Sequence, residues 1–382
     1  MIYLDQSATS LHKPPEVVEA VRRGLSGEYG NPTRGAHTPA LRALQEVALV
    51  RRAVSKYFDV SPLEVAFTFN ATIALNMAIK GALTPQDRVL TTPYAHNSML
   101  RPLYELQDMG MRLDIMPLDK HGCCPIELFV QYLHADTTAI ALNPMSNVTG
   151  DIAPLADIIR LCHQRDLLLI LDLSQWAGTR AMPSVAQWPR TLIAFTGHKS
   201  LYGPQGTGGL INRGNVPLRP MISGGSGIHS FERQHPSTFP EVCEAGTVNL
   251  PGIMGLRAGV EWLMTTGQDK VQQHLSTLRE RFISGMRTIP GVRLYGSQMA
   301  DAGPVVSLNI GDLPAAVISD ALNERYNIAT RAGAHCAPLM HQALGTVEQG
   351  TVRFSFSFFN DVSEIEAAIE SICALSCHSQ QN

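Results

Sequence analysis

The sequence has no apolar run that approaches the roughly 18 residues a membrane-spanning helix needs. It has no dense basic segment either: 30 Lys and Arg residues stand against 33 Asp and Glu residues, and the formal net charge is -3. The first residues, Met1 to Gln6, lack the basic and then apolar pattern of a secretion signal. These absences predict a cytoplasmic protein with no membrane and no nucleic-acid partner.

The cysteines do not form the pattern of a disulfide framework. There are seven, an odd number, in a long chain without a signal pattern, so we expect reduced thiols. Cys373 and Cys377 are four residues apart on an expected terminal helix, and the adjacent Cys123 and Cys124 have no ligand residues nearby. We therefore predict no metal site.

No Gly-x-Gly-x-x-Gly motif follows the first strand, which argues against a dinucleotide-binding protein. What the chain does have is 382 residues with 45% hydrophobic and 16% charged side chains, the composition of a globular protein with a large core. No internal repeat or low-complexity tract interrupts it.

From Val65 onward, short apolar runs alternate with helical patterns. The runs predict strands at 65–69, 88–92, 112–116, 138–142, 167–171, 192–195 and 208–212. After Gly252 come long helical patterns, short strands at 292–294, 305–309 and 352–357, and a terminal helix at 363–375. We predict an α/β fold with a large, mostly parallel-sheet domain (14–250) and a small α+β domain (1–13 with 251–382). Ligands of such sheets bind at the carboxyl ends of the strands.

Two predicted strands deliver a lysine and a carboxylate to that edge. The segment from Leu192 to Leu210 places Lys199 in a glycine-rich turn after one strand, and the 167–171 strand leads into Asp172, with Gln175 three residues later. A pyridoxal 5'-phosphate (PLP) site requires both groups, because the lysine forms the Schiff base and the carboxylate keeps the pyridine nitrogen protonated. Lys199 alone would read as a solvated surface lysine.

Other polar residues also follow predicted strands. The amides of Ala71 and Thr72, at the start of a helix, and the Thr72 hydroxyl are suited to a phosphate, although a capped helix explains them equally. His96 could stack on an aromatic ring or be a loop histidine, and the polar loop 143–150, which contains Asn147, could bond a ligand or be a turn.

A second cluster lies in the predicted small domain. Arg331 could bind a carboxylate bidentately and Cys336 could be a reactive thiolate, against the simpler reading of a buried cysteine beside a surface arginine. Arg353, on an otherwise apolar strand, is a second anion-binding candidate or an edge-strand charge.

Together these motifs resemble the cysteine desulfurase and selenocysteine lyase branch of the class V aminotransferases, over nearly the whole chain. The resemblance rests on Asp172 with Gln175, Thr196-Gly197-His198-Lys199, Leu201-Tyr202-Gly203-Pro204 with Gly206, Ala245-Gly246-Thr247, and Arg331 with Gly333-Ala334-His335-Cys336. It implies a PLP-dependent transferase of fold type I, aminotransferase-like, that is active as a homodimer. It also implies removal of sulfur or selenium from L-cysteine or L-selenocysteine to give L-alanine, through a persulfide on Cys336.

The resemblance further implies a role for each matching residue. Lys199 would carry the cofactor and move the proton at the substrate Cα. Asp172 would pair with the pyridine nitrogen of the cofactor, Gln175 would bond the ring hydroxyl and His96 would stack on the ring. The phosphate would be held by Thr72, Thr196 and His198, and by Thr247 of the second subunit. Asn147, Arg331 and Arg353 would bind the substrate carboxylate.

The Cys336 thiolate should lie partly exposed near Arg331 or a charged His335. The short Arg-to-Cys spacing resembles the compact-loop group, which implies a dedicated sulfur-acceptor protein or small thiols. Ala95 and Ala334 depart from the family pattern, and the N-terminus is shorter than usual. Two alternatives stay open: a PLP-dependent β-eliminating lyase or aminotransferase with Cys336 incidental, and a non-catalytic nucleotide-binding or sulfur-relay protein.

Overall fold

The centre of the fold is a seven-stranded sheet. The computed structural model describes residues 1–33 and 35–379. The strand order is β2 (Val65–Thr68), β8 (Gly208–Arg213), β7 (Thr191–Thr196), β6 (Leu168–Asp172), β5 (Ala139–Leu142), β3 (Arg88–Thr91) and β4 (Arg112–Ile115). Only β8 runs antiparallel to its neighbours among these seven strands. The mostly parallel sheet predicted from the βα alternation is confirmed.

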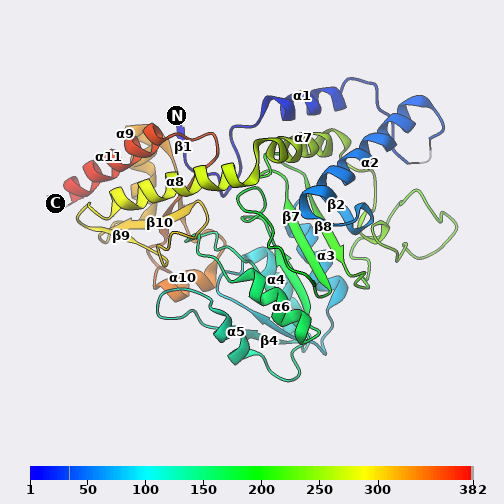
Figure 1. Ribbon diagram of the computed structural model, residues 1–382, viewed down its shortest axis with the longest axis horizontal. Helices are drawn as coiled ribbons and strands as arrows, with labels where there is room; N and C mark the ends of the chain where they lie inside the picture. Colours follow the sequence, from blue (N-terminus) through cyan, green and yellow to red (C-terminus); the bar gives the residue numbers. More distant parts are fainter. Residues whose placement is uncertain (34, 380–382) are drawn as a thin grey trace.

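Helices cover both faces of this sheet, because its central strands are apolar on both sides. In β6, Leu169 and Leu171 face one core while Leu168 and Ile170 face the other. The second core is closed by α3 (Ala71–Ala82) and α4 (Asn97–Asp108), and the first by α2 (Thr38–Phe58), α6 (Leu155–Gln164) and α7 (Leu250–Thr266). Helix α1 (Pro15–Gly24) lies along α7, and α5 (Ile126–Tyr132) lies near α6 (Figure 1). Such double coverage is what allows continuous apolar strands.

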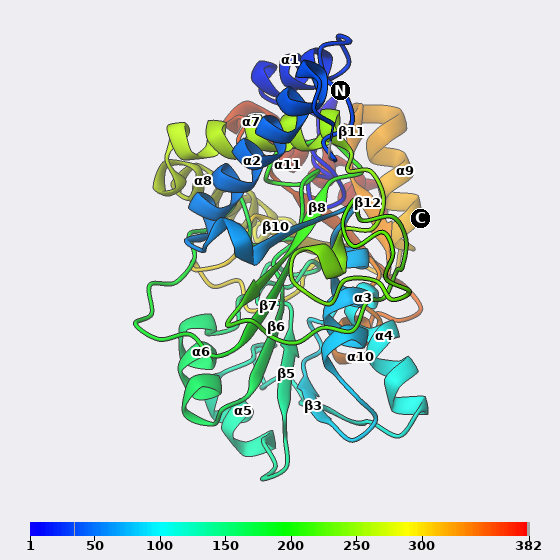
Figure 2. The ribbon, with the colours of Figure 1, turned by 90° about the vertical axis from the view of Figure 1, so that its right-hand side faces the viewer.

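A four-stranded antiparallel sheet forms the other end of the molecule. Its order is β12 (Arg331–Gly333), β13 (Thr351–Ser355), β10 (Val305–Ile310) and β9 (Val292–Leu294). Around it lie α8 (Gln268–Met286), α9 (Ala315–Tyr326), α10 (Pro338–Leu344) and α11 (Val362–Ser379), and the first residues of the chain lie at this end too (Figures 1 and 2). Sequence patterns did not predict β12 and α10, which flank Cys336. The proposed division into domains stays a prediction.

The first ten residues connect the two ends of the molecule. Strand β1 (Ile2–Tyr3) pairs with β11 (Ile328–Ala329), and Asp5 forms a bridge with Ser355 of β13. Farther along, the amide and the hydroxyl of Ser10 both donate to the carbonyl of His198, each at 2.9 Å. We call residues 2–10 the N-terminal strap. Across the described residues, no helix has the length and apolar character to cross a membrane.

Candidate active site

A cavity of about 180 Å³ opens at the carboxyl ends of the parallel strands. Its wall contains every predicted cofactor-binding residue except Thr247, together with Asn147 of the predicted substrate set. The lining residues are Asn70, Ala71, Thr72, His96, Ser98, Asn143, Asn147, Asp172, Ser174, Gln175, Thr196, His198 and Lys199. The sheet places them together because β6, β7, β5 and β3 all end at this edge.

The Asp172 carboxylate is buried and held from two sides. It ends β6, where its residue pairs with Ala194 of β7. Asn143 Nδ2 donates to one carboxylate oxygen at 2.7 Å, and the amide and hydroxyl of Ser174 donate to the other at 2.9 and 2.5 Å. These three donors fix the direction of the carboxylate. The group is therefore suited to pair with a cation in the cavity.

Lys199 lies on the turn after β7, in the wall of the same cavity. Burial lowers the pKa of its amine to about 8, although the nearby Asp172 acts in the opposite direction. The turn is packed closely against the backbone of Gly178. This residue has a φ of 87°, and a Cβ on it would overlap the carbonyl oxygen of Ser200. At neutral pH the lowered pKa gives a larger neutral, nucleophilic fraction than an ordinary lysine has.

The imidazole ring of His96 is neutral because of its surroundings. Burial, followed by the charge of Lys199, lowers its pKa to about 4. The Ser98 amide donates to His96 Nδ1 at 3.0 Å, so the neutral ring carries its proton on Nε2. The Ser98 hydroxyl is 3.0 Å from the same nitrogen and 2.9 Å from Thr72 Oγ1. Ser98 thus links the predicted ring-stacking residue to the predicted phosphate-binding residue.

The start of α3 is built as a polar cradle. The Asn70 side chain accepts a hydrogen bond from the Ile73 amide at 3.0 Å and caps the helix. A Cβ on Gly208 would lie 2.9 Å from the Asn70 backbone, so only glycine allows β8 to approach this helix start. The cradle fits an anion such as a phosphate.

Arg331 and Arg353 lie outside the lining of this cavity, on neighbouring strands. The residues pair across β12 and β13, and both guanidinium groups contact the carboxylate of Asp5. Arg353 is 3% exposed, and its Nη1 donates to the carbonyl of Asn147 at 3.1 Å. Asn147 Nδ2 in turn donates to the carbonyl of His335 at 2.8 Å. The three predicted substrate-binding residues therefore belong to one connected network.

Cys336 is exposed, on a loop with an uncommon backbone conformation. His335 and Cys336 have φ angles of 49° and 56°, a region that bulky residues rarely adopt. The loop is held on both sides, because the Cys336 carbonyl accepts from the Asn97 amide at 2.8 Å while the His335 carbonyl accepts from Asn147. Such strain persists only where surrounding contacts enforce it. The Cys336 backbone therefore lies next to Asn97, the residue that follows His96.

The expectation of a charged His335 beside the thiol was wrong. Its ring is buried, Nε2 lies 3.0 Å from the Thr351 carbonyl, and burial, followed by the charge of Arg353, lowers its pKa to about 2. The ring is therefore neutral. Ala334 is exposed and Ala95 is buried. Thr247 lies in the wall of a different, mostly apolar cavity, with its Oγ1 3.5 Å from Asn31 Nδ2.

Three residues of the site were missed from the sequence. Ser174 and Ser98 stand two positions after Asp172 and His96, an offset typical of side chain to backbone capping, so that signal was available. Asp5 has no such local signal, because its partners Arg331 and Arg353 are more than 300 positions away.

The fold and the cavity define an α/β protein with a buried lysine and carboxylate at the carboxyl edge of a parallel sheet. The chain belongs to the class-V aminotransferase family, whose model, Aminotransferase class-V, matches residues 2–368. It is 30% identical over 384 residues to the cysteine desulfurase CsdA of Escherichia coli (strain K12), covering 97% of this chain and 93% of that protein. It is also 30% identical to a probable cysteine desulfurase of Pseudomonas aeruginosa, covering 96% and 91%.

Solved structures agree with these sequence comparisons. The apo structure of a cysteine desulfurase from Thermococcus onnurineus NA1 superposes with a TM-score of 0.90 at 27% identity, over 99% of this chain and 95% of that chain. The crystal structure of E. coli CsdA gives a TM-score of 0.86 at 26% identity, over 98% and 94%. The predicted fold class is confirmed.

Proposed function

We propose that the protein is a PLP-dependent cysteine desulfurase that converts L-cysteine to L-alanine and takes the sulfur onto Cys336. The observation that carries this proposal is the joint placement of two chemical centres. The cavity gathers Lys199, Asp172 and His96, and the loop with the exposed Cys336 is hydrogen-bonded to the residue that follows His96. The curated relatives named cysteine desulfurase support the same activity.

The residues present fit PLP, the cofactor of class-V aminotransferases. The fixed Asp172 carboxylate suits a protonated pyridine nitrogen, and the cradle at the start of α3, with Thr72, Thr196 and His198, suits the phosphate. Gln175, in the same wall, would bond the ring hydroxyl, and His96 would lie on the ring face. When bound, PLP supplies an acceptor for the electrons released as the substrate Cα–H bond breaks.

The side chains then divide the remaining work. Lys199, with its lowered pKa, takes the proton from the substrate Cα and returns a proton to the product. Arg331 and Arg353 hold the substrate carboxylate. The Cys336 thiolate attacks the substrate sulfur, forming an S–S bond as the Cβ–S bond breaks, and the electron pair left on Cβ is quenched by a proton to give alanine.

The finer assignments belong to the same proposal. We propose a homodimer in which Thr247 of each subunit reaches the phosphate site of the other, which agrees with its position outside its own subunit's cavity. The exposed Cys336 persulfide would pass its sulfur to an acceptor protein or a small thiol. Selenocysteine is a second candidate substrate.

The test compares products from L-cysteine, L-selenocysteine and cysteine sulfinate, assayed separately. We expect the wild-type holoenzyme to form alanine and sulfide in equal amounts from L-cysteine in the presence of a reducing thiol. Cys336→Ala should lose this activity, whereas Cys373→Ala, which removes an exposed cysteine on α11, should keep it. Pyruvate in place of alanine, or full sulfide release by Cys336→Ala, would contradict the proposal. A visible absorption band that Lys199→Ala leaves unchanged would contradict the role of Lys199.

A further inference from the structure

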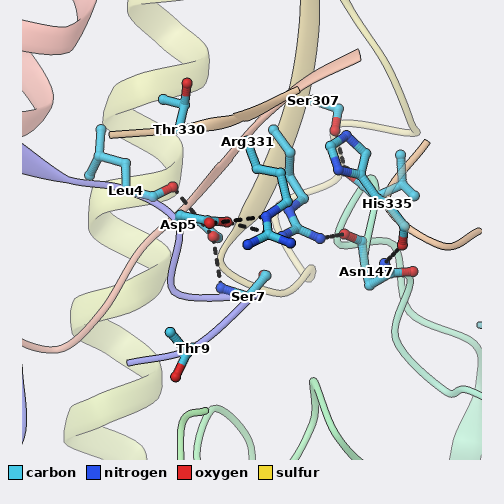
Figure 3. Close-up of polar contacts among 12 residues, drawn as sticks. Leu4, Asp5, Ser7, Thr9, Asn147, Ser307, Thr330, Arg331 and His335 are labelled. Carbon is cyan, nitrogen blue, oxygen red and sulfur yellow. Dashed lines mark hydrogen bonds and ion pairs between the residues drawn. The ribbon is translucent and has the colours of Figure 1, made fainter. Parts of the chain in front are cut away.

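Asp5, in the N-terminal strap, lies between the two arginines of the proposed substrate site. Its Oδ1 is 3.1 Å from Arg353 Nη2, and its Oδ2 is 3.0 Å from Arg331 Nε. Figure 3 shows Asp5 on one side of the Arg331 side chain and Asn147 and His335 on the other side. One carboxylate therefore contacts both guanidinium groups.

Several backbone contacts hold the main chain of Asp5 in place. It bridges to Ser355, the Ser355 amide donates to the Leu4 carbonyl at 2.8 Å, and the Tyr3 hydroxyl donates to the Asp5 carbonyl at 3.2 Å. Past Asp5, the Ser7 carbonyl accepts from Gln175 Nε2 at 3.1 Å. The strap therefore ties the arginine pair to the wall of the cofactor cavity.

Each arginine has at least one nitrogen without a hydrogen-bond partner among the described residues. Arg331 is half-exposed, and within the part of the chain that the structure describes its side chain bonds to Asp5 through Nε alone, which leaves both of its terminal nitrogens for another anion. Arg353 is buried, and its Nε has no hydrogen-bond partner among the described residues. Because that nitrogen is buried, the donors open to a ligand are those of Arg331. Two guanidinium groups and one carboxylate leave a net charge of +1, which a single substrate carboxylate balances.

We propose that Asp5 is a positioning residue for the substrate carboxylate: it holds Arg331, beside the buried charge of Arg353, in the orientation in which the free terminal nitrogens of Arg331 bind that group. This inference rests on the proposed function. The competing reading is that Asp5 occupies the anion site and must be displaced by substrate. The two readings predict opposite effects of removing its charge, and the strap contacts that fix Asp5 favour the first.

The test uses the holoenzyme with Asp5→Asn, Asp5→Glu and, as a matched control, Asp114→Asn, which removes an arginine partner at the edge of the large sheet. Calorimetry measures the dissociation constants of L-alanine and L-alaninamide, which differ only in the carboxylate. Steady-state assays with L-cysteine give KM and kcat.

We expect Asp5→Asn to weaken L-alanine binding about ten-fold or more, the factor that corresponds to a lost charge-assisted hydrogen bond, and to leave L-alaninamide binding unchanged. KM should rise by a similar factor with kcat changed less than about three-fold. Asp5→Glu should recover part of the loss, and Asp114→Asn should show none. Tighter or unchanged L-alanine binding in Asp5→Asn would overturn the proposal.

The control measurements separate the possible failures. If Asp5→Asn does not fold, Asp5→Ser, which also removes the carboxylate, takes its place, and a folded Asp5→Ser with unchanged discrimination between acid and amide would refute positioning. If the wild type makes no alanine from L-cysteine, the proposed function fails, while the binding comparison still tests Asp5.

Discussion

Replacing Lys199 by Met should stabilise the protein at neutral pH once any carbonyl cofactor has been removed. Burial places the pKa of Lys199 at about 8 in the folded protein, against 10.5 for an ordinary lysine. At about 1.36 kcal/mol per pKa unit, this difference corresponds to about 3 kcal/mol. The value is an upper limit, because the side chain borders the cavity and is partly accessible from it.

The sign follows from proton binding. Below about pH 8 the amine is protonated in both states, so the folded protein carries the full cost of a buried charge. Between about pH 8 and pH 10.5 the folded state has released the proton and the unfolded state still binds it, so stability rises with pH. Lys199→Met does not carry the cost of the buried charge. Its free energy of unfolding at pH 7 should therefore exceed that of the wild type by up to about 3 kcal/mol, and this difference should vanish near pH 10.5.

The assay is urea unfolding of both proteins at a series of pH values from 7 to about 10.5, after hydroxylamine treatment and dialysis. The difference in the free energy of unfolding between the two proteins cancels the titrating groups that do not interact with Lys199, and His96 and His198, which do interact with it, are neutral throughout this pH range. A difference that does not change with pH, or a variant less stable than wild type at pH 7, would refute the assignment of a buried, ionisable amine to Lys199.

Three further predictions concern the surroundings of the site. Gly178→Ala should lower the melting temperature by several degrees because its Cβ meets the backbone of the Lys199 turn at positive φ, whereas Gly225→Ala, in open space with ordinary φ, should shift it little. Ser98→Ala should weaken PLP binding several-fold at equilibrium while the fold, measured by circular dichroism, stays intact; unchanged affinity would show that its bonds to Thr72 and His96 have no part in the site. A thiol reagent under native conditions should label exposed Cys336 well before buried Cys124, whose pKa burial raises, and equal labelling rates would contradict the burial of Cys124.

Local patterns predicted most of the large sheet and its cavity. The strands around Asp172 and Lys199 are continuous apolar runs followed by polar residues, and the parallel arrangement brings their ends together without further information. The surroundings of Cys336 were less predictable, because β12 and α10 are short and depend on contacts with distant strands. The neutral state of His335 depends on its burial and on the charge of Arg353, and the role of Asp5 depends on a bridge to Ser355; neither has a local signal in the sequence.

The titrating groups of the site divide into two sets, and one physical cause explains the division. Burial lowers the pKa of His96 and His198 to about 4 and of His335 to about 2, so all three rings are neutral at physiological pH. The charges that remain are fixed by partners, Asp172 by its three donors and the arginine pair by Asp5. Neutral rings can accept or donate hydrogen bonds without competing for the fixed charges. A pH dependence of turnover above about pH 6 is therefore not expected to originate from these histidines.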